Sequence, residues 1–134
     1  MIDVTAAILV KDGKILIAKR KPNGKLPDKW EFPGGKVETG ESAQTCLTRE
    51  MQEEFGIDVR IGQFLGESVY HYQHGSIRLL AYLTRWQGGG FSLKDHADYA
   101  WVQSDQLEGF DFTPADLPFV DKLVSGEIDI SRGI

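Results

Sequence analysis

Cysteine is almost absent from this chain, and this scarcity excludes one way of holding a small protein together. Cys46 is the single cysteine among 134 residues, so an intrachain disulfide framework is impossible. The three histidines include no pair at the spacing of metal ligands, which argues against a zinc site built from Cys and His. We expect Cys46 to be a small apolar residue of the core rather than a nucleophile.

Long apolar runs are also missing. No stretch approaches the ~18 consecutive apolar residues of a membrane-spanning helix. The opening Met1-Ile2-Asp3 is not a basic segment followed by a long apolar run, as a signal peptide would be. Linkers, low-complexity segments and internal repeats are absent too. The sequence therefore predicts a single domain over residues 1–134, in the cytoplasm and without a membrane partner, as a monomer or homodimer.

The chain also has no excess of positive charge. The net charge of −5 argues against a polymeric nucleic-acid partner, which normally requires a basic patch. The charge is uneven, because residues 1–36 hold eight Lys/Arg against four Asp/Glu and residues 37–134 hold seven against sixteen. A basic segment facing an acidic one suits a metal-bound polyphosphate. A solvated loop rim containing Lys19-Arg20-Lys21 and Lys25 is an equally good interpretation of the same charges.

Residues 42–55 carry the most informative pattern in the chain. Placed on a helix, their apolar residues form one stripe, and Glu50 and Glu54 fall inside it. Two carboxylates on a core-facing surface lose hydration and repel each other unless a cation compensates them. Clustered hard oxygen ligands favour Mg²⁺, with Mn²⁺ as a substitute, and Mg²⁺ usually completes its shell with a substrate phosphate. The apolar stripe consists of Ala43, Cys46, Leu47 and Met51.

The remaining patterns predict a mixed sheet with two separate helices, that is, an α+β domain. The order of the strands is left undecided by pattern alone. A final helix is expected to begin near Thr113-Pro114 and to bury Leu117, Val120, Leu123 and Val124. Strands are expected at residues 4–10, 15–19, 57–61, 64–72, 76–86 and 99–102, with Asp12-Gly13 and Gln73-His74-Gly75 at two hairpin turns.

The segment from Gly35 to Ile57 resembles the Nudix box, in which Gly, Glu and Arg-Glu-apolar-x-Glu-Glu-x-Gly follow one another at fixed spacing. The preceding Trp30-Glu31-Phe32-Pro33-Gly34 is similar to the lead-in of the MutT-like branch. This resemblance implies the Nudix fold, an α/β/α sandwich around a mixed β-sheet. It also implies Mg²⁺-dependent hydrolysis of a nucleoside triphosphate, such as 8-oxo-dGTP, to a nucleoside monophosphate and pyrophosphate.

The resemblance further implies roles for individual residues. Arg49 is expected to orient Glu53 or Glu50 by a bidentate contact, and a simple intrahelical salt bridge is the alternative. Glu41 is expected to brace the loop or to meet a metal through water. The implied metal ligands are the carbonyl of Gly34 with Glu50, Glu53 and Glu54, and the implied catalytic residues are Glu50, Glu53 and Arg49. Arg20, in the basic segment, and Lys36, one residue beyond the glycines, are candidate phosphate ligands; the alternative for Lys36 is a surface lysine without a role.

Two acidic positions nearer the C-terminus complete the expected site. Asp98, or Asp95 in the same loop, is a candidate for a further metal ligand or base, whereas His96 is expected to be a loop residue satisfied by hydrogen bonds. Asp116 stands where the MutT-like branch commonly has an Asn that reads the nucleobase. An ionised Asp only accepts hydrogen bonds, which favours cytosine or a guanine-type base. The alternative is that Asp116 caps or braces the start of the final helix, where an acid is also favoured.

Three functions are compatible with these residues. The first is a nucleoside triphosphate pyrophosphohydrolase, with CTP or modified dCTP as the alternative substrate to an oxidised guanine nucleotide. The second is a Nudix hydrolase acting on another nucleoside diphosphate derivative. The third is a nucleotide-sensing module without catalysis, which would usually lack some of the glutamates that are present here.

Overall fold

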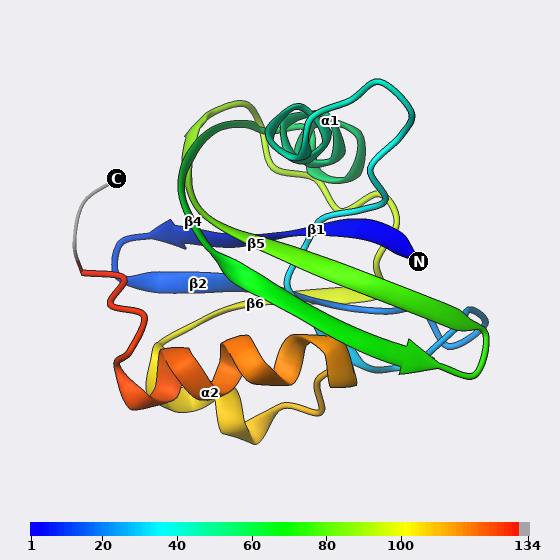
Figure 1. Cartoon of the computed structure of the whole chain (residues 1–134). Helices are drawn as coiled ribbons and strands as arrows, with labels where there is room; N and C mark the ends of the chain where they lie inside the picture. The colour runs from blue at the N-terminus through cyan, green and yellow to red at the C-terminus, as the bar shows by residue number, and fades with distance from the viewer. Residues whose placement is uncertain (132–134) are drawn as a thin grey trace.

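The computed structural model describes residues 1–131, which form a layered α+β domain (Figure 1). Two α-helices lie on opposite sides of a central sheet, with α1 above it and α2 below it in the view of Figure 1. The strands are β1 (Ile2–Lys11), β2 (Lys14–Lys19), β3 (Trp30–Glu31), β4 (Asp58–Tyr72), β5 (Gly75–Gly88) and β6 (Asp98–Val102); the α-helices are α1 (Ala43–Phe55) and α2 (Leu117–Ser125), and 3-10 helices cover Ser104–Gly109 and Pro114–Asp116.

The sheet is mixed, as the sequence predicts. Its order is β3-β2-β1-β5-β4, and β6 pairs with β2. The parallel pair is β1 with β5, whereas the other pairs are antiparallel. Asp12 and Gly13 turn the β1–β2 hairpin with φ of 52° and 76°, the left-handed values that a two-residue hairpin requires.

One predicted break in the sheet is wrong. The segments 57–61 and 64–72 were expected to be separate strands, but they belong to the single strand β4. Its pairing with β5 shifts register between Ile61 and Phe64 and again between Phe64 and Gly66. A bulge inserts extra residues while pairing continues, so these residues bend the strand without ending it.

Each face of β1 supplies a different core because alternate side chains of a strand point in opposite directions. Ala7 and Leu9 pack in the cluster beneath α1 with Leu47, Met51 and Phe55. Ala6 and Ile8 pack in the cluster above α2 with its buried apolar residues. This is the α/β/α sandwich expected from the resemblance.

The ends of α1 follow from its sequence. The Ser42 hydroxyl accepts a hydrogen bond from the Thr45 N–H at 3.0 Å, which satisfies one free donor of the first turn. Gly56 closes the helix in the left-handed conformation with φ of 70°. Both caps fix where the glutamates of α1 stand relative to the sheet.

The prediction for the last helix is partly wrong. A 3-10 turn over Pro114–Asp116 precedes α2, so α2 begins at Leu117 rather than near Thr113. The turn changes the phase of the buried face: Leu117 is 44% exposed, while Phe119 is buried together with Val120 and Leu123.

Residues 33–37 run along β1 as an irregular segment that leads to α1. The N–H groups of Thr5 and Ala7 donate to the carbonyls of Gly35 at 2.8 Å and Pro33 at 2.7 Å. On the other side, the Cys46 thiol donates weakly to the Gly35 carbonyl, which confirms Cys46 as a buried core residue. The glycines are therefore held between β1 and α1. Within residues 1–131, no helix is long and apolar enough to cross a membrane.

Candidate metal and nucleotide site

A cavity of about 610 Å³ collects most of the side chains that the sequence singles out. Acidic groups of α1 and its neighbouring loops line one part of it, and basic groups of the loop after β2 line another. A third part, toward the start of α2, is formed by aromatic and small residues. The lining includes Arg20, Lys21, Lys25, Glu31, Gly34, Gly35, Lys36, Glu50, Glu54, Tyr72, His74, Asp95, His96, Thr113, Ala115 and Asp116.

Glu50 and Glu54 are the acidic groups of α1 that reach the cavity. Their side chains are only 13% and 15% exposed, as expected for residues on the apolar stripe. The Oε2 atom of Glu54 is buried without a hydrogen-bond partner. Burial, and next the negative charges of Glu50 and Glu31, raise the pKa of Glu54 to about 9. Within residues 1–131, no lysine or arginine forms an ion pair with this carboxyl group.

Two glycines allow the backbone to approach these carboxylates. A Cβ atom on Gly35 would stand 2.2 Å from Cδ of Glu50, and one on Gly34 would stand 1.9 Å from the Thr5 carbonyl oxygen. The carbonyls of Pro33 and Gly35 accept backbone hydrogen bonds from β1. Among the described residues, none donates a hydrogen bond to the intervening Gly34 carbonyl. The structure thus leaves free the one carbonyl that the resemblance assigns to a metal.

Arg49 ties the glutamates to the loop before α1. Its guanidinium donates through Nε to Glu41 Oε2 at 2.7 Å and through Nη2 to Glu41 Oε1 at 2.9 Å. Nη1 donates to Glu50 at 2.9 Å and to Glu53 at 3.1 Å. The expected bidentate contact therefore exists, but its partner is Glu41 rather than Glu50 or Glu53. The reason is that the loop carboxylate presents both oxygens to the fork of the guanidinium.

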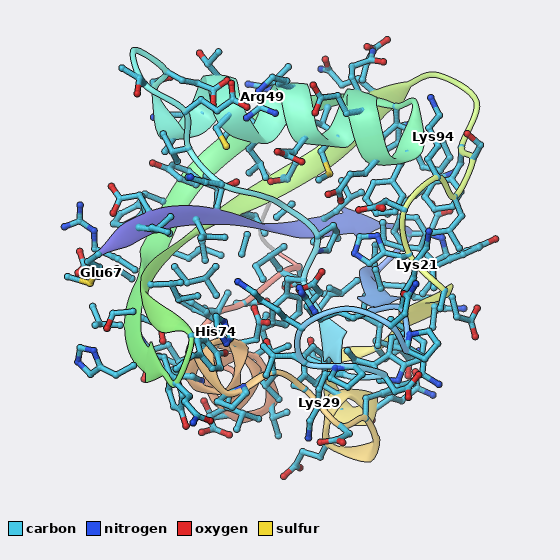
Figure 2. All side chains as sticks on the ribbon, turned by 90° about the vertical axis from the view of Figure 1, so that its right-hand side faces the viewer. Lys21, Lys29, Arg49, Glu67, His74 and Lys94 are labelled. Atoms are coloured by element: carbon cyan, nitrogen blue, oxygen red, sulfur yellow. The ribbon has the colours of Figure 1, made fainter. Side chains whose placement is uncertain are left out.

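This network lowers the pKa of Glu41 to about 2, chiefly through the Arg49 hydrogen bonds. Glu41 also accepts from the Glu38 N–H at 3.1 Å, so it braces the loop as predicted. Figure 2 shows Arg49 on α1, on the side of the molecule away from His74 and Lys29. Arg49 is absent from the cavity lining, which makes it a residue that orients Glu50 rather than one that meets a ligand.

Glu53 lies apart from the other two glutamates. Its side chain is 60% exposed and does not line the cavity. Accordingly, no three Asp, Glu, His or Cys side chains within residues 1–131 form a preassembled metal cluster. The free carbonyl of Gly34, the orphaned oxygen of Glu54 and the adjacent Glu50 nevertheless fit a hard divalent cation, because all supply oxygen.

Basic groups face these oxygens across the cavity. Arg20, Lys21 and Lys25 belong to the loop after β2, and Lys36 follows the glycine pair. Figure 2 shows Lys21 and Lys29 on this loop. The Arg20 Nη1 atom is already paired with Glu31 Oε1 at 2.9 Å, whereas Lys36 has no ion-pair partner within residues 1–131. The structure thus places both predicted phosphate ligands around the cavity, with only Lys36 uncommitted.

Asp116 lies at the third part of the cavity. It is 4% exposed, its Oδ2 accepts from the Thr113 hydroxyl, and its Oδ1 has no partner. Asp116 is the N-cap residue of α2 and its side chain makes no capping hydrogen bond, but its bond to Thr113 braces the turn before the helix, so bracing stays an alternative to base recognition. Tyr72 forms the neighbouring wall, and its hydroxyl accepts from the Ala115 N–H at 2.9 Å.

Burial raises the pKa of Asp116 well above the usual range of an aspartic acid, and the charge of Glu31 adds to this effect. The sequence-based reasoning treated Asp116 as ionised and able only to accept. A protonated carboxyl group both donates and accepts, so its hydrogen-bonding capacity is that of the Asn it replaces. The predicted preference for bases rich in N–H donors assumed a negative charge on Asp116, and the raised pKa of Asp116 removes that reason for it.

The loop before β6 supplies a different acid from the first-named candidate. Asp98 is absent from the cavity lining, and its Oδ1 accepts from the N–H of Tyr99 at 2.8 Å. Asp95, the second candidate, does line the cavity. Asp98 pairs with Lys19 in the ladder between β6 and β2, which holds its backbone at the edge of the sheet.

Glu31 and His96 are site residues whose roles sequence reasoning missed. The His96 side chain is 6% exposed, and its Nε2 lies 2.8 Å from Glu31 Oε2. The expectation of a hydrogen-bonded loop residue is thus right for Nε2, but Nδ1 is buried without a partner. The sequence did offer a signal for Glu31. A charged residue between two aromatic ones, Trp30 and Phe32, is a candidate for a partly buried side chain that needs a hydrogen-bond partner.

Comparison with known proteins agrees with this geometry. Residues 1–123 match the NUDIX domain. The chain belongs to the NUDIX family. It is 33% identical over 129 residues to the CTP pyrophosphohydrolase of Escherichia coli strain K12, covering 93% of each chain. It is 32% identical over 114 residues to the 8-oxo-dGTP diphosphatase of the same organism, covering 84% of this chain and 88% of that one.

Solved structures place this Nudix hydrolase among MutT-like folds. The solution structure of the E. coli ORF135 protein matches 96% of the chain with a TM-score of 0.81 and 32% identity, and 91% of that chain is covered. The MutT protein of Methanosarcina mazei Go1 matches with a TM-score of 0.84 at 23% identity, with 96% of each chain covered. The second likeness concerns the fold alone. The MutT-like resemblance of the sequence is confirmed.

The buried Glu54 carboxyl predicts how metal-free stability depends on pH. The folded-state pKa is raised, so above pH 4.5 the unfolded chain releases a proton that the folded chain keeps up to about pH 9. The free energy of unfolding therefore falls through this window, by on the order of 1 kcal/mol per pH unit for one group. Glu54→Gln removes this loss. Urea unfolding in EDTA should show the variant more stable than wild type by over ~1 kcal/mol at pH 8, with little difference at pH 5.

The exposed Glu108 supplies a matched control, since Glu108→Gln changes an exposed glutamate distant from the cavity lining. This control should track the wild type at both pH values. A Glu54→Gln variant that is less stable than wild type at pH 8 would mean that Glu54 stabilises the metal-free fold.

Proposed function

We propose that this Nudix hydrolase is a Mg²⁺-dependent nucleoside triphosphate pyrophosphohydrolase that releases a nucleoside monophosphate and pyrophosphate. One observation supports the proposal above others. The same cavity is lined by Glu54, whose Oε2 atom is buried without a hydrogen-bond partner, and by Lys36, which has no ion-pair partner within residues 1–131. A metal-bound polyphosphate supplies the missing partner of each, with the cation at the carboxylates and phosphate oxygens at the lysine.

In this proposal, Glu50, Glu54 and the Gly34 carbonyl hold the divalent cation. When bound, that cation neutralises phosphate charge and lowers the pKa of a coordinated water. Glu53, which lies outside the cavity lining, is proposed to join by a change of rotamer in which its exposed carboxylate gives up its Arg49 contact. Mn²⁺ should substitute for Mg²⁺, because both accept oxygen ligands.

The remaining groups orient the substrate and the ligands. Lys36, with Arg20, Lys21 and Lys25 around it, binds the phosphate chain and screens its charge. Arg49 holds Glu50 toward Gly35 and prevents the helix carboxylates from separating through mutual repulsion. Asp95 stands close enough to raise the pKa of Glu54 by its charge, which makes it the better candidate than Asp98 for a further ligand.

Base selection is proposed to occur at Asp116. Its Oδ1 atom is buried without a hydrogen-bond partner, and Thr113 and Tyr72 line the same cavity. A neutral carboxyl group offers a donor and an acceptor in one plane, which suits a guanine-type edge such as that of 8-oxo-dGTP. CTP or a modified dCTP is the second candidate, favoured by the relative named CTP pyrophosphohydrolase that matches 93% of the chain.

The proposed activity requires both a divalent cation and Glu54. Nucleotide hydrolysis should be undetectable in EDTA and return with Mg²⁺ or Mn²⁺. Glu54→Gln should lower kcat by at least ~10²-fold at saturating Mg²⁺, as expected when a ligand of a catalytic metal is lost. The measurement is a panel of nucleoside triphosphates with products separated by anion exchange, and Glu108→Gln is the matched control.

The initial products discriminate the proposal from other chemistry. Pyrophosphate and nucleoside monophosphate in equal amounts are expected from every accepted substrate. Orthophosphate with nucleoside diphosphate would contradict the proposed reaction, and binding without turnover by the wild type would favour a sensing module.

Substitution of Asp116 tests base selection. Asp116→Asn keeps a neutral donor and acceptor, so it should retain the wild-type ranking of kcat/KM among nucleotides. Asp116→Ala removes both groups, and the preferred base should lose ~10-fold or more relative to the others, about the value of one or two buried hydrogen bonds. Circular dichroism melting of both variants separates this effect from a loss of fold. An unchanged ranking in Asp116→Ala would remove Asp116 from base recognition.

A further inference from the structure

His96 occupies a fixed position behind the Glu54 carboxylate. Its ring stacks on Phe55, with ring centroids 5.6 Å apart and 8° between the planes. Its Nε2 atom is 2.8 Å from Glu31 Oε2, so the ring has one defined hydrogen bond at its far edge. A side chain that is 6% exposed and held on two sides cannot rotate freely.

The backbone around His96 is also fastened to the end of α1. The N–H groups of Ser92 and Lys94 donate to the carbonyls of Phe55 at 2.9 Å and Glu54 at 3.1 Å. On the other side of the histidine, the Ala97 N–H donates to the Lys19 carbonyl at 2.9 Å. Figure 2 shows Lys94 beside the C-terminal end of α1. The loop therefore connects the last turn of α1 with the end of β2.

Two orphaned atoms face each other across this junction. His96 Nδ1 and Glu54 Oε2 are 3.9 Å apart, and both are buried without a hydrogen-bond partner. A buried polar atom without a hydrogen bond destabilises the folded state, so we expect these two atoms to share a hydrogen-bond partner. A separation of 3.9 Å is too long for a direct hydrogen bond and is readily bridged by one water that bonds to both atoms.

We propose that His96 is a positioning residue that holds the Glu54 carboxylate in the rotamer that presents it to the divalent cation. This inference rests on the proposed function. With the Nε2 proton donated to Glu31, the Nδ1 lone pair faces Glu54 and accepts one hydrogen of a bridging water, whose other hydrogen bonds Glu54 Oε2. An ionised carboxylate oxygen accepts two partners, so Glu54 Oε2 keeps one lone pair for the cation while the water fixes the orientation of the group.

The His96 ring also belongs to a chain of contacts that links the two sides of the cavity. Glu31 binds His96 through Oε2 and Arg20 through Oε1, at 2.8 and 2.9 Å. Arg20 lines the cavity on the side proposed to bind phosphate, and its Nε atom donates to the Lys25 carbonyl at 2.8 Å. A continuous chain of contacts thus joins the cation side to the phosphate side. His96 is its one member that reaches both Glu54 and Glu31.

Three substitutions separate the hydrogen bonds of His96 from its packing. His96→Phe keeps a flat ring against Phe55 and removes both nitrogens. His96→Asn places a polar atom near the position of Nδ1 and gives up the contact with Glu31. His71→Phe is the control, because His71 is an exposed histidine of β4 that bonds only Ser76 and does not line the cavity.

The readout is Mn²⁺ affinity in the absence of nucleotide, measured by the electron paramagnetic resonance signal of free Mn²⁺. His96→Phe should weaken Mn²⁺ binding ~10-fold or more, the usual cost of losing a group that orients a metal ligand. His96→Asn should recover most of that loss, and His71→Phe should match the wild type. With Mg²⁺ and nucleotide, His96→Phe should lower kcat with little change in KM, since the substrate contacts remain.

The outcomes distinguish this inference from the proposed function. Wild-type affinity and kcat within about twofold in His96→Phe, while Glu54→Gln loses both, would overturn the role of His96 and leave the function intact. A lower melting temperature in His96→Phe with unchanged Mn²⁺ affinity would assign the residue to packing alone and overturn the inference equally. Absence of Mn²⁺ binding by the wild type would overturn both.

Discussion

The structure depends on the burial of two carboxylates between α1 and the sheet. Glu50 and Glu54 are on the face of α1 that also carries Leu47, Met51 and Phe55, and their side chains are only 13% and 15% exposed, so the carboxylates lose most of their hydration. The metal-free protein responds by raising the pKa of Glu54. A fold that keeps such a group buried is poised to bind a cation, because binding removes the desolvation and repulsion together.

The surrounding structure makes this burial tolerable. Arg49 balances Glu50 from the outer side through a fork anchored on Glu41, and Gly35 has no Cβ that would enter the space of the Glu50 carboxylate. The segment containing that glycine is in turn bonded to β1 through Thr5. The loop, the helix and the first strand therefore form one unit, and a change in any of them is transmitted to the position of Glu50.

Local patterns predicted the elements well, and distant contacts account for the errors. Periodicity placed α1 and its caps, because Ser42, the apolar stripe and Gly56 are all within one segment. The buried face of α2 was misjudged because a 3-10 turn at Pro114 shifts its phase, which hydrophobic spacing alone does not reveal. The Glu31–His96 pair joins residues 65 positions apart, and the choice between Asp95 and Asp98 depends on how β6 pairs with β2. Such contacts are set by strand order, which pattern reasoning left undecided.

In the proposed site, the cation binds between the Gly34 carbonyl and the two buried glutamates. Crystals grown with Mn²⁺ and measured for anomalous scattering near the manganese absorption edge test it directly. We expect an anomalous peak within ~2.2 Å of the Gly34 carbonyl oxygen and of oxygens from Glu50 and Glu54, a distance typical of small divalent cations. A peak bound by neither buried glutamate, or a well-ordered site with no peak at all, would contradict it.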